Sequence, residues 1–161
     1  MARSRHYWLL KSEPDCFSID DLQQAPDQTT YWDGVRNYQA RNFLRDSIKQ
    51  GDRVLYYHSN AKPPGVAGVA KVVRDGYPDF TAWDPKDAHF DPKSKADDPT
   101  WYMVDVAFER KFAQLLPLDL LRQQSELADM ELLRKGSRLS VQPVAKAEFD
   151  AILKLARRQA G

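Results

Sequence analysis

The sequence is poor in cysteine, almost neutral in net charge and free of long hydrophobic runs. Its single cysteine, Cys16, excludes an internal disulfide framework and any cysteine-rich zinc site. The 24 Lys and Arg residues against 23 Asp and Glu leave a net charge of +1, which argues against holding nucleic acid by bulk electrostatics alone. No run approaches the roughly 18 apolar residues of a membrane span, and the apolar stretch at residues 7–10 is too short for the core of a signal peptide.

The chain nevertheless contains enough apolar material for a folded core. Of its 161 residues 42% are hydrophobic and 11% aromatic, a composition that argues against disorder. We expect a single domain over residues 1–161. The mild basic excess lies in residues 111–161, which carry nine basic and six acidic groups. The lack of a basic targeting tail favours a bacterial cytoplasmic protein, or a nuclear one if the source is eukaryotic.

Hydrophobic patterning predicts an α+β fold with a curved sheet or small barrel. We expect strands at 6–11, 53–58, 65–73, 101–111 and 139–144, because these segments are rich in apolar, β-branched and aromatic residues. We expect helices after the N-caps Ser18 and Asn37, within 118–135, and over 145–157. The polar, proline-rich segment 78–99 is predicted to be a long loop.

Catalytic and metal-binding patterns are weak. His58 and Ser59 are neighbours on a predicted strand and point to opposite faces, so they cannot form a nucleophile–base pair. No phosphate-binding glycine loop occurs. The segment Asp84, Asp87, His89 and Asp91 resembles alternating oxygen ligands but lacks the glycine of a calcium loop. We therefore predict no catalytic residue, no metal and no cofactor.

Aromatic and basic residues around Trp32 carry more information. Trp32 lies between predicted elements beside Asp33, Arg36 and Asn37, and a tryptophan with polar neighbours suits a flat heteroaromatic ligand. A purely structural role in the core is the alternative. The helix that follows has basic residues at i, i+4 and i+8, which predicts a stripe facing either phosphates or solvent: Arg41, Arg45 and Lys49. A second basic cluster is Arg134, Lys135 and Arg138.

Six ordered blocks cover almost the whole chain: YWLLKSEPD (7–15), WDGVRNYQARNFLRD (32–46), GDRVLYYHSN (51–60), GVAGVAKVV (65–73), YPD (77–79) and RLSVQPV (138–144). Together they closely resemble the EVE domain, a family of the PUA-like superfamily that is related to YTH domains. The resemblance implies a PUA-like curved mixed sheet or pseudo-barrel with peripheral helices. It also implies a pocket for a modified base: a modified cytosine in DNA, or a modified RNA base.

Position by position, the resemblance implies a ligand-binding set of Lys11, Ser12, Trp32, Asp33, Tyr57, His58, Ser59, Asn60, Ser140, Gln142 and Pro143. A second cage tryptophan has no clear match, so Tyr77 or another aromatic residue is a candidate for that wall. Phosphate contacts are expected from Lys11, Arg36, Arg41, Arg45 and Arg138.

The resulting hypothesis is a non-catalytic reader of modified DNA or RNA. The alternative is an enzyme or small-molecule-binding domain that acts on a free modified nucleoside or metabolite, with His58 or Asp79 as acid–base groups. A weaker alternative is docking to a partner protein through Trp32. The sequence leaves the base modification, the choice between DNA and RNA, the oligomeric state and any protein partner open.

Overall fold

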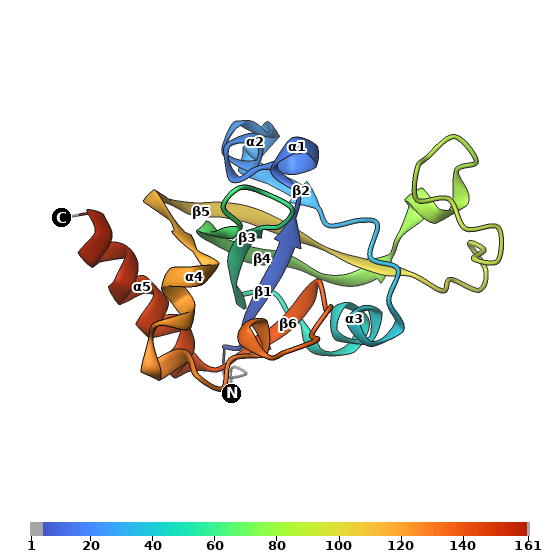
Figure 1. The fold of residues 1–161 in the computed structure, drawn as a ribbon. Helices are drawn as coiled ribbons and strands as arrows, with labels where there is room; N and C mark the ends of the chain where they lie inside the picture. The colour runs from blue at the N-terminus through green and yellow to red at the C-terminus, as the bar shows by residue number, and fades with distance from the viewer. Residues whose placement is uncertain (1–4, 161) are drawn as a thin grey trace.

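The computed structural model describes residues 5–160, which fold around a six-stranded mixed sheet (Figure 1). The strand order is β2-β5-β4-β3-β1-β6, with β1 and β3 parallel and all other neighbours antiparallel. The strands are β1 (Tyr7–Ser12), β2 (Thr29–Tyr31), β3 (Arg53–His58), β4 (Gly65–Pro78), β5 (Tyr102–Pro117) and β6 (Val141–Val144).

Five α-helices surround the sheet: α1 (Pro14–Phe17), α2 (Ile19–Gln24), α3 (Tyr38–Asn42), α4 (Leu118–Arg122) and α5 (Lys146–Ala160). Single 3-10 turns lie at Pro26–Gln28, Phe80–Trp83, Ser125–Leu127 and Glu131–Leu133, and a π turn lies at Phe43–Ser47. None of the helices within residues 5–160 has the length and apolar character needed to cross a bilayer.

The sheet is curved, because its two longest strands are repeatedly out of register. β4 and β5 pair with four register shifts between Val66 and Tyr77. Each such irregularity bends the strand and increases its twist. The predicted α+β architecture, a curved mixed sheet with peripheral helices, is confirmed.

Strand alternation gives the sheet two apolar faces. In β3, Val54 and Tyr56 belong to one core cluster, while Leu55 and Tyr57 belong to the other. The first cluster continues into α2 and the π turn, and the second is covered by α4 and α5, which contribute Leu121 among others. Both faces exclude water, so both hold the sheet in place.

Local signals predicted the starts of α2 and α3 correctly, whereas the short helix α1 was not predicted. Ser18 forms a capping box with Asp21, and the Asn37 side chain accepts a hydrogen bond from the Ala40 backbone N–H. The basic stripe on the second helix, however, is wrong. The helix widens into the π turn after Asn42, which changes the spacing of side chains, and Lys49 lies beyond its end.

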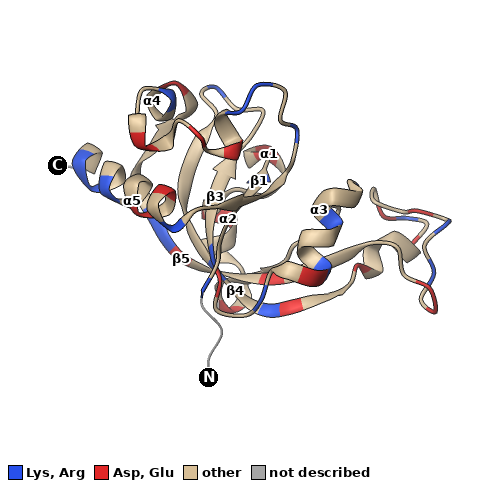
Figure 2. Cartoon of the chain, turned by 90° about the horizontal axis from the view of Figure 1, so that it is seen from below, with Lys and Arg blue, Asp and Glu red and all other residues tan. Residues whose placement is uncertain are grey.

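The lengths of β4 and β5 were underestimated, and the strand expected at 139–144 is shorter, since β6 begins at Val141. β4 runs on to Pro78 and β5 to Pro117, past the charged residues at which alternation ceases, because the two strands hydrogen-bond to each other there. β2 was not predicted, since only three residues pair with β5. The segment after β4 forms the predicted loop, which extends from the body of the molecule and carries both charge signs (Figures 1 and 2).

Candidate functional site

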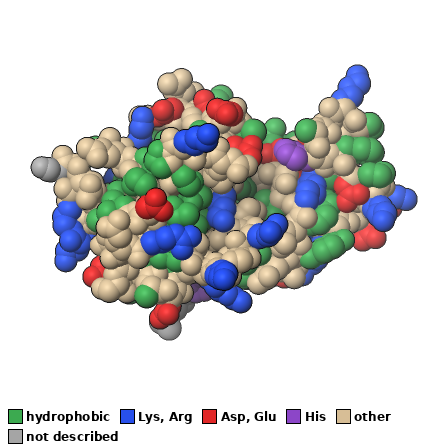
Figure 3. Space-filling view, viewed as in Figure 1, with side chains coloured by type: hydrophobic (Ala, Val, Ile, Leu, Met, Phe, Trp, Pro, Cys, Tyr) green, Lys and Arg blue, Asp and Glu red, His purple; other side chains and the backbone are tan. Residues whose placement is uncertain are grey.

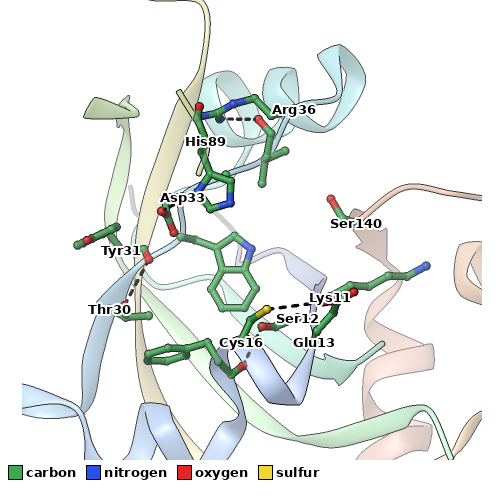
Figure 4. A pocket seen from close by; sticks show the side chains of 14 residues that line it. Lys11, Ser12, Glu13, Cys16, Thr30, Tyr31, Asp33, Arg36, His89 and Ser140 are labelled. Atoms are coloured by element: carbon green, nitrogen blue, oxygen red, sulfur yellow. Dashed lines mark hydrogen bonds and ion pairs between the residues drawn. The ribbon is translucent and has the colours of Figure 1, made fainter. Parts of the chain in front are cut away.

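A hollow of about 470 Å³ lies where β1 ends and the segment after β2 passes over it (Figure 4). We call it the Trp32 hollow. Its volume lies within the range of small-ligand sites, about 300–1,000 Å³. It is lined by Lys11, Ser12, Glu13, Cys16, Phe17, Thr30, Tyr31, Trp32, Asp33, Gly34, Val35, Arg36, His89 and Ser140.

Trp32 belongs to the core and also lines the hollow. Its residue surface is only 8% exposed, and its ring meets Tyr56 edge-on in the core at a centroid distance of 5.3 Å. The Trp32 backbone N–H donates to the Val104 carbonyl at 2.8 Å. The same side chain lines the hollow together with Phe17, whereas the Tyr31 ring points away from Trp32 and packs against Phe80 at a centroid distance of 5.2 Å (Figure 4). The core therefore fixes an aromatic wall in one orientation.

The long loop is fastened to this wall at His89. Gly34 has a φ of +80°, and a Cβ atom there would lie 2.6 Å from the His89 imidazole. The Arg36 guanidinium donates to the His89 carbonyl at 2.6 Å, and His89 Nδ1 lies 3.3 Å from an Asp33 carboxylate oxygen. Glycine is needed at position 34 because it tolerates this backbone conformation and leaves room for the imidazole.

Asp79 holds the segment that contains Gly34 and Arg36 in place. Its fully buried carboxylate accepts hydrogen bonds from the Gly34 backbone N–H at 2.9 Å, from Arg36 at 3.0 Å and from the Thr81 hydroxyl at 2.5 Å. Burial alone would raise the pKa of Asp79, but the hydrogen bonds from Thr81, Gly34 and Arg36 outweigh it and hold the pKa below its usual value. Asp79 is thus a charged brace for the hollow.

Two charged residues that line the hollow have pKa values shifted by burial. Burial raises the pKa of Asp33, and burial lowers the pKa of Lys11. In Figure 4 the Lys11 side chain points away from Asp33 and His89, and its ammonium lies 5.7 Å from the Tyr57 ring centre. Asp33 and Glu13 are the carboxylates that line the hollow, and Asp33 directly follows Trp32 in the chain.

A family model described as the EVE domain matches residues 6–155. The chain belongs to the EVE domain family. Thymocyte nuclear protein 1 of Danio rerio is 47% identical over 165 residues, covering 92% of this chain and 71% of that protein.

Two solved structures are also closely similar. A hypothetical protein from Leishmania major matches with a TM-score of 0.93 and 50% identity, covering 98% of both chains. The human THYN1 protein in complex with 5-methylcytosine-containing DNA matches with a TM-score of 0.88 and 45% identity, covering 94% of this chain and 97% of that one.

In this EVE domain five of the residues proposed to bind ligand line the same hollow, namely Lys11, Ser12, Trp32, Asp33 and Ser140. They come from the end of β1, the segment after β2 and the residue before β6. The Lys11 backbone N–H donates to the Ser140 carbonyl at 2.9 Å, which joins two of these segments. The Ser12 hydroxyl donates to the Phe17 carbonyl at 2.8 Å and so positions the aromatic wall.

The proposed residues of β3 do not line the Trp32 hollow. Tyr57 pairs with Lys11 across the parallel strands and is 4% exposed within the core cluster beneath α4 and α5. His58 shares a face with Ser12, but its Nε2 accepts a hydrogen bond from the Ile19 backbone N–H at 3.1 Å. The start of α2 therefore occupies the ring edge that a ligand would need.

Ser59 and Asn60 brace the end of β1 from outside the hollow. The Ser59 backbone N–H donates to the Ser12 carbonyl at 3.0 Å, and the Asn60 amide donates to the Glu13 carboxylate. Asn60 adopts a φ of +50°, which lets the chain turn at this point.

The remaining predicted positions lie farther along the sheet. Gln142 is 1% exposed and donates to the Leu139 carbonyl at 2.9 Å, on the face opposite Ser12. Pro143 pairs with Trp8 and is exposed at a different hollow. Tyr77, the candidate for a second cage wall, donates to Asp105 at 2.5 Å and does not line the Trp32 hollow.

Three of the four arginines expected at phosphates already have protein partners. Arg36 pairs with Asp79, Arg41 donates to the Thr100 carbonyl at 2.6 Å, and Arg45 forms a two-point pair with Asp46 at 2.8 Å. The fourth, Arg138, is exposed beside a second hollow of about 360 Å³, which we call the Arg138 hollow. It is lined by Asn37, Gln39, Glu131, Arg134, Lys135, Gly136, Ser137, Arg138 and Leu139.

Eight residues that line the Trp32 hollow were not among the predicted ligand-binding or phosphate-contacting residues: Glu13, Cys16, Phe17, Thr30, Tyr31, Gly34, Val35 and His89. Phe17 lies two residues after the first matching block, which ends at Asp15, and Tyr31 directly precedes the second, so proximity in sequence was an available signal for both. His89 had no local signal, because it reaches Asp33 across the long loop. Its ligand atoms and those of Asp33 and Asp87 lie within 4.8 Å of one another, and His89 Nδ1 lies 3.3 Å from a carboxylate oxygen of each aspartate.

Proposed function

We propose that this EVE domain binds nucleic acid and holds a modified base in the Trp32 hollow, with a modified cytosine in DNA as the first candidate. The observation that carries the proposal is a ligand-sized hollow with aromatic and anionic lining. It occurs in a chain that is 45% identical to the human THYN1 protein, whose structure contains 5-methylcytosine DNA.

The base would have to leave the base stack of the nucleic acid before it could enter the hollow. A base inside a duplex cannot reach a concave site, so it must be flipped out or come from a single strand. Trp32 would stack on it, with Phe17 nearby, and stacking on an aromatic side chain contributes roughly 1–3 kcal/mol per base. Because Trp32 is fixed by the core, little side-chain entropy is lost on binding.

Polar groups in the hollow suit the edge of a cytosine. A carboxylate accepts a hydrogen bond from the exocyclic amino group of cytosine, and Asp33 supplies that carboxylate. Ser12 and Ser140 add side-chain hydroxyls. Ser59 and Asn60 would act indirectly, by positioning the end of β1.

Stacking alone does not select a methylated base. Burial of one methyl group contributes about 0.8 kcal/mol, a preference of about fourfold. Stronger selection requires an apolar wall that fits the modification closely. Phe17 and the methyl group of Thr30 are lining groups with the chemistry for such a wall.

We further propose that the domain is a reader without catalytic activity. Both candidate acid–base groups are engaged elsewhere: His58 accepts from Ile19, and the buried Asp79 is held by Arg36. Incubation with modified nucleosides followed by mass spectrometry tests this point, and turnover of any of them would contradict it.

The binding experiment compares oligonucleotides that carry cytosine, 5-methylcytosine or 5-hydroxymethylcytosine, together with methylated RNA, at fixed salt. We expect tighter binding of a modified cytosine, and a loss of about tenfold or more on Trp32→Ala. Because Trp32 also contributes to the core, Asp33→Asn provides a second variant, which removes a carboxylate that lines the hollow with little change in side-chain size.

Tyr38→Ala is the matched control, since Tyr38 is 63% exposed and lines neither hollow. Thermal unfolding monitored for each variant separates loss of binding from loss of folding. Equal affinity for all the oligonucleotides, unchanged by Trp32→Ala and Asp33→Asn, contradicts the proposal.

A further inference from the structure

The Arg138 hollow adjoins the Trp32 hollow. The Trp32 hollow is lined by Val35, Arg36 and Ser140, and the Arg138 hollow by Asn37 and Leu139, among others. The same two chain segments, 35–39 and 138–140, therefore bound both hollows. Consecutive Cα atoms are only 3.8 Å apart, so a ligand that fills one hollow has its neighbouring groups at the entrance of the other.

Cations dominate the lining of the Arg138 hollow. Arg134, Lys135 and Arg138 face a single acidic residue, Glu131. Arg134 lies 3.4 Å from Glu131, but 75% of its side chain is exposed, and such a surface pair holds the guanidinium only weakly. Among residues 5–160 the structure records no ion pair for Lys135 or Arg138. Figure 3 shows Lys and Arg side chains gathered on the face that carries β6 in Figure 1.

Neutral donors complete the lining. The Asn37 side chain uses its carbonyl oxygen to cap α3, which leaves its amide N–H₂ to donate. Ser137 Oγ is buried without a hydrogen-bond partner among the described residues. Buried polar atoms without partners are uncommon, and an acceptor oxygen at this site would satisfy the hydroxyl.

We propose that the Arg138 hollow binds a backbone phosphate of the nucleotide next to the base held in the Trp32 hollow. This inference rests on the proposed function. Guanidinium groups bind phosphate oxygens through paired hydrogen bonds, and such contacts set the position of the strand without reading its sequence. In this proposal Arg134, Lys135 and Arg138 bind the phosphate. Arg36, Arg41 and Arg45 do not, because they already bind protein groups.

The test uses a fluorescein-labelled DNA oligonucleotide with one 5-methylcytosine, and Arg134→Gln combined with Arg138→Gln. We expect the double variant to bind about tenfold more weakly or worse, and its dependence of log Kd on log salt to become shallower by about one unit. The preference for 5-methylcytosine over cytosine should stay unchanged. The matched control is Arg157→Gln with Arg158→Gln, which removes two exposed cations from the end of α5.

A neutral methylphosphonate at each phosphate flanking the modified base then locates the contact. We expect one position to weaken wild-type binding and to have no effect on the Arg134/Arg138 double variant. The proposal is overturned if the double variant keeps the wild-type salt slope, or if every methylphosphonate weakens both proteins equally. Failure of the proposed function has a different signature, which is equal affinity for modified and unmodified cytosine in the wild-type protein.

Discussion

The two hollows share bounding segments but differ in what holds their walls. The wall of the Trp32 hollow is tied by buried hydrogen bonds, in which Asp79 holds Gly34 and Arg36, and Arg36 holds His89. The rim of the Arg138 hollow consists of exposed cations around a turn at Gly136. The comparison teaches that partners, rather than residue type, decide which arginines are available to a ligand.

The largest expected effect comes from removing the brace of the Trp32 hollow. Asp79→Ala leaves the mostly buried Arg36 guanidinium without its counter-charge, so we expect the free energy of unfolding to fall by about 3–5 kcal/mol. Denaturant titration measures this loss. Glu131→Gln, which removes the acidic group of the Arg138 hollow, should change stability little, and an equal loss in both variants contradicts the difference between the hollows.

The same brace makes stability sensitive to acid. The native pKa of Asp79 lies below its usual value, so its ionised form stabilises the fold above the ordinary pKa of about 3.9. This contribution is lost as the pH falls through the lower native pKa. We expect Asp79→Asn to flatten the decline in stability below about pH 4, as measured by denaturant titration across that range.

Two glycines with nearly the same backbone conformation provide the next comparison. Gly34 has a φ of +80° and touches the His89 ring, whereas Gly136 has a φ of +81° and open space around it. Backbone strain in the left-handed region costs about 1–2 kcal/mol for alanine, and displacing a packed group adds about 1–3 kcal/mol. We expect Gly34→Ala to lower stability more than Gly136→Ala and to weaken base binding, as thermal unfolding and oligonucleotide titration will show.

Ligand binding in the Trp32 hollow should depend on the charge of Asp33. Burial raises the pKa of Asp33, so its carboxylate protonates at a higher pH than an ordinary aspartate, whose value is about 3.9. A protonated carboxyl loses the charged acceptor for the cytosine amino group. Affinity should therefore fall as the pH decreases, beginning above pH 4, by about tenfold in total. Asp33→Asn should bind weakly at every pH, and a wild-type pH profile in that variant excludes this role.

The smallest effect is expected for an arginine that already has a partner. Arg45 is held by Asp46 through two hydrogen bonds of 2.8 Å, so Arg45→Gln should change DNA affinity by less than about twofold. Arg138→Gln, which removes one cation from the Arg138 hollow, should have a larger effect at the same salt concentration. Equal losses from the two substitutions would show that general charge, and not a localised site, attracts the DNA.

Much of the local structure was predictable. Residues 53–58 form β3 as expected, and the caps at Ser18 and Asn37 begin their helices, because alternation and capping depend on a few neighbouring residues. The π turn was not predictable, since helix spacing looks continuous through Arg45 in the sequence. The extension of β4 and β5 escaped prediction for a related reason, because strand pairing maintains it after the apolar pattern has ended.

By itself the sequence determined the class of fold, the resemblance to the EVE family and the aromatic residue at the centre of the hollow. These features depend on short patterns and literal blocks. Only the tertiary structure decided which side chains share a hollow and which cations remain without partners. Arg36 meets Asp79 across 43 residues and His89 across 53. Contacts between such distant residues follow from the folding of the sheet and long loop, and no local pattern encodes them.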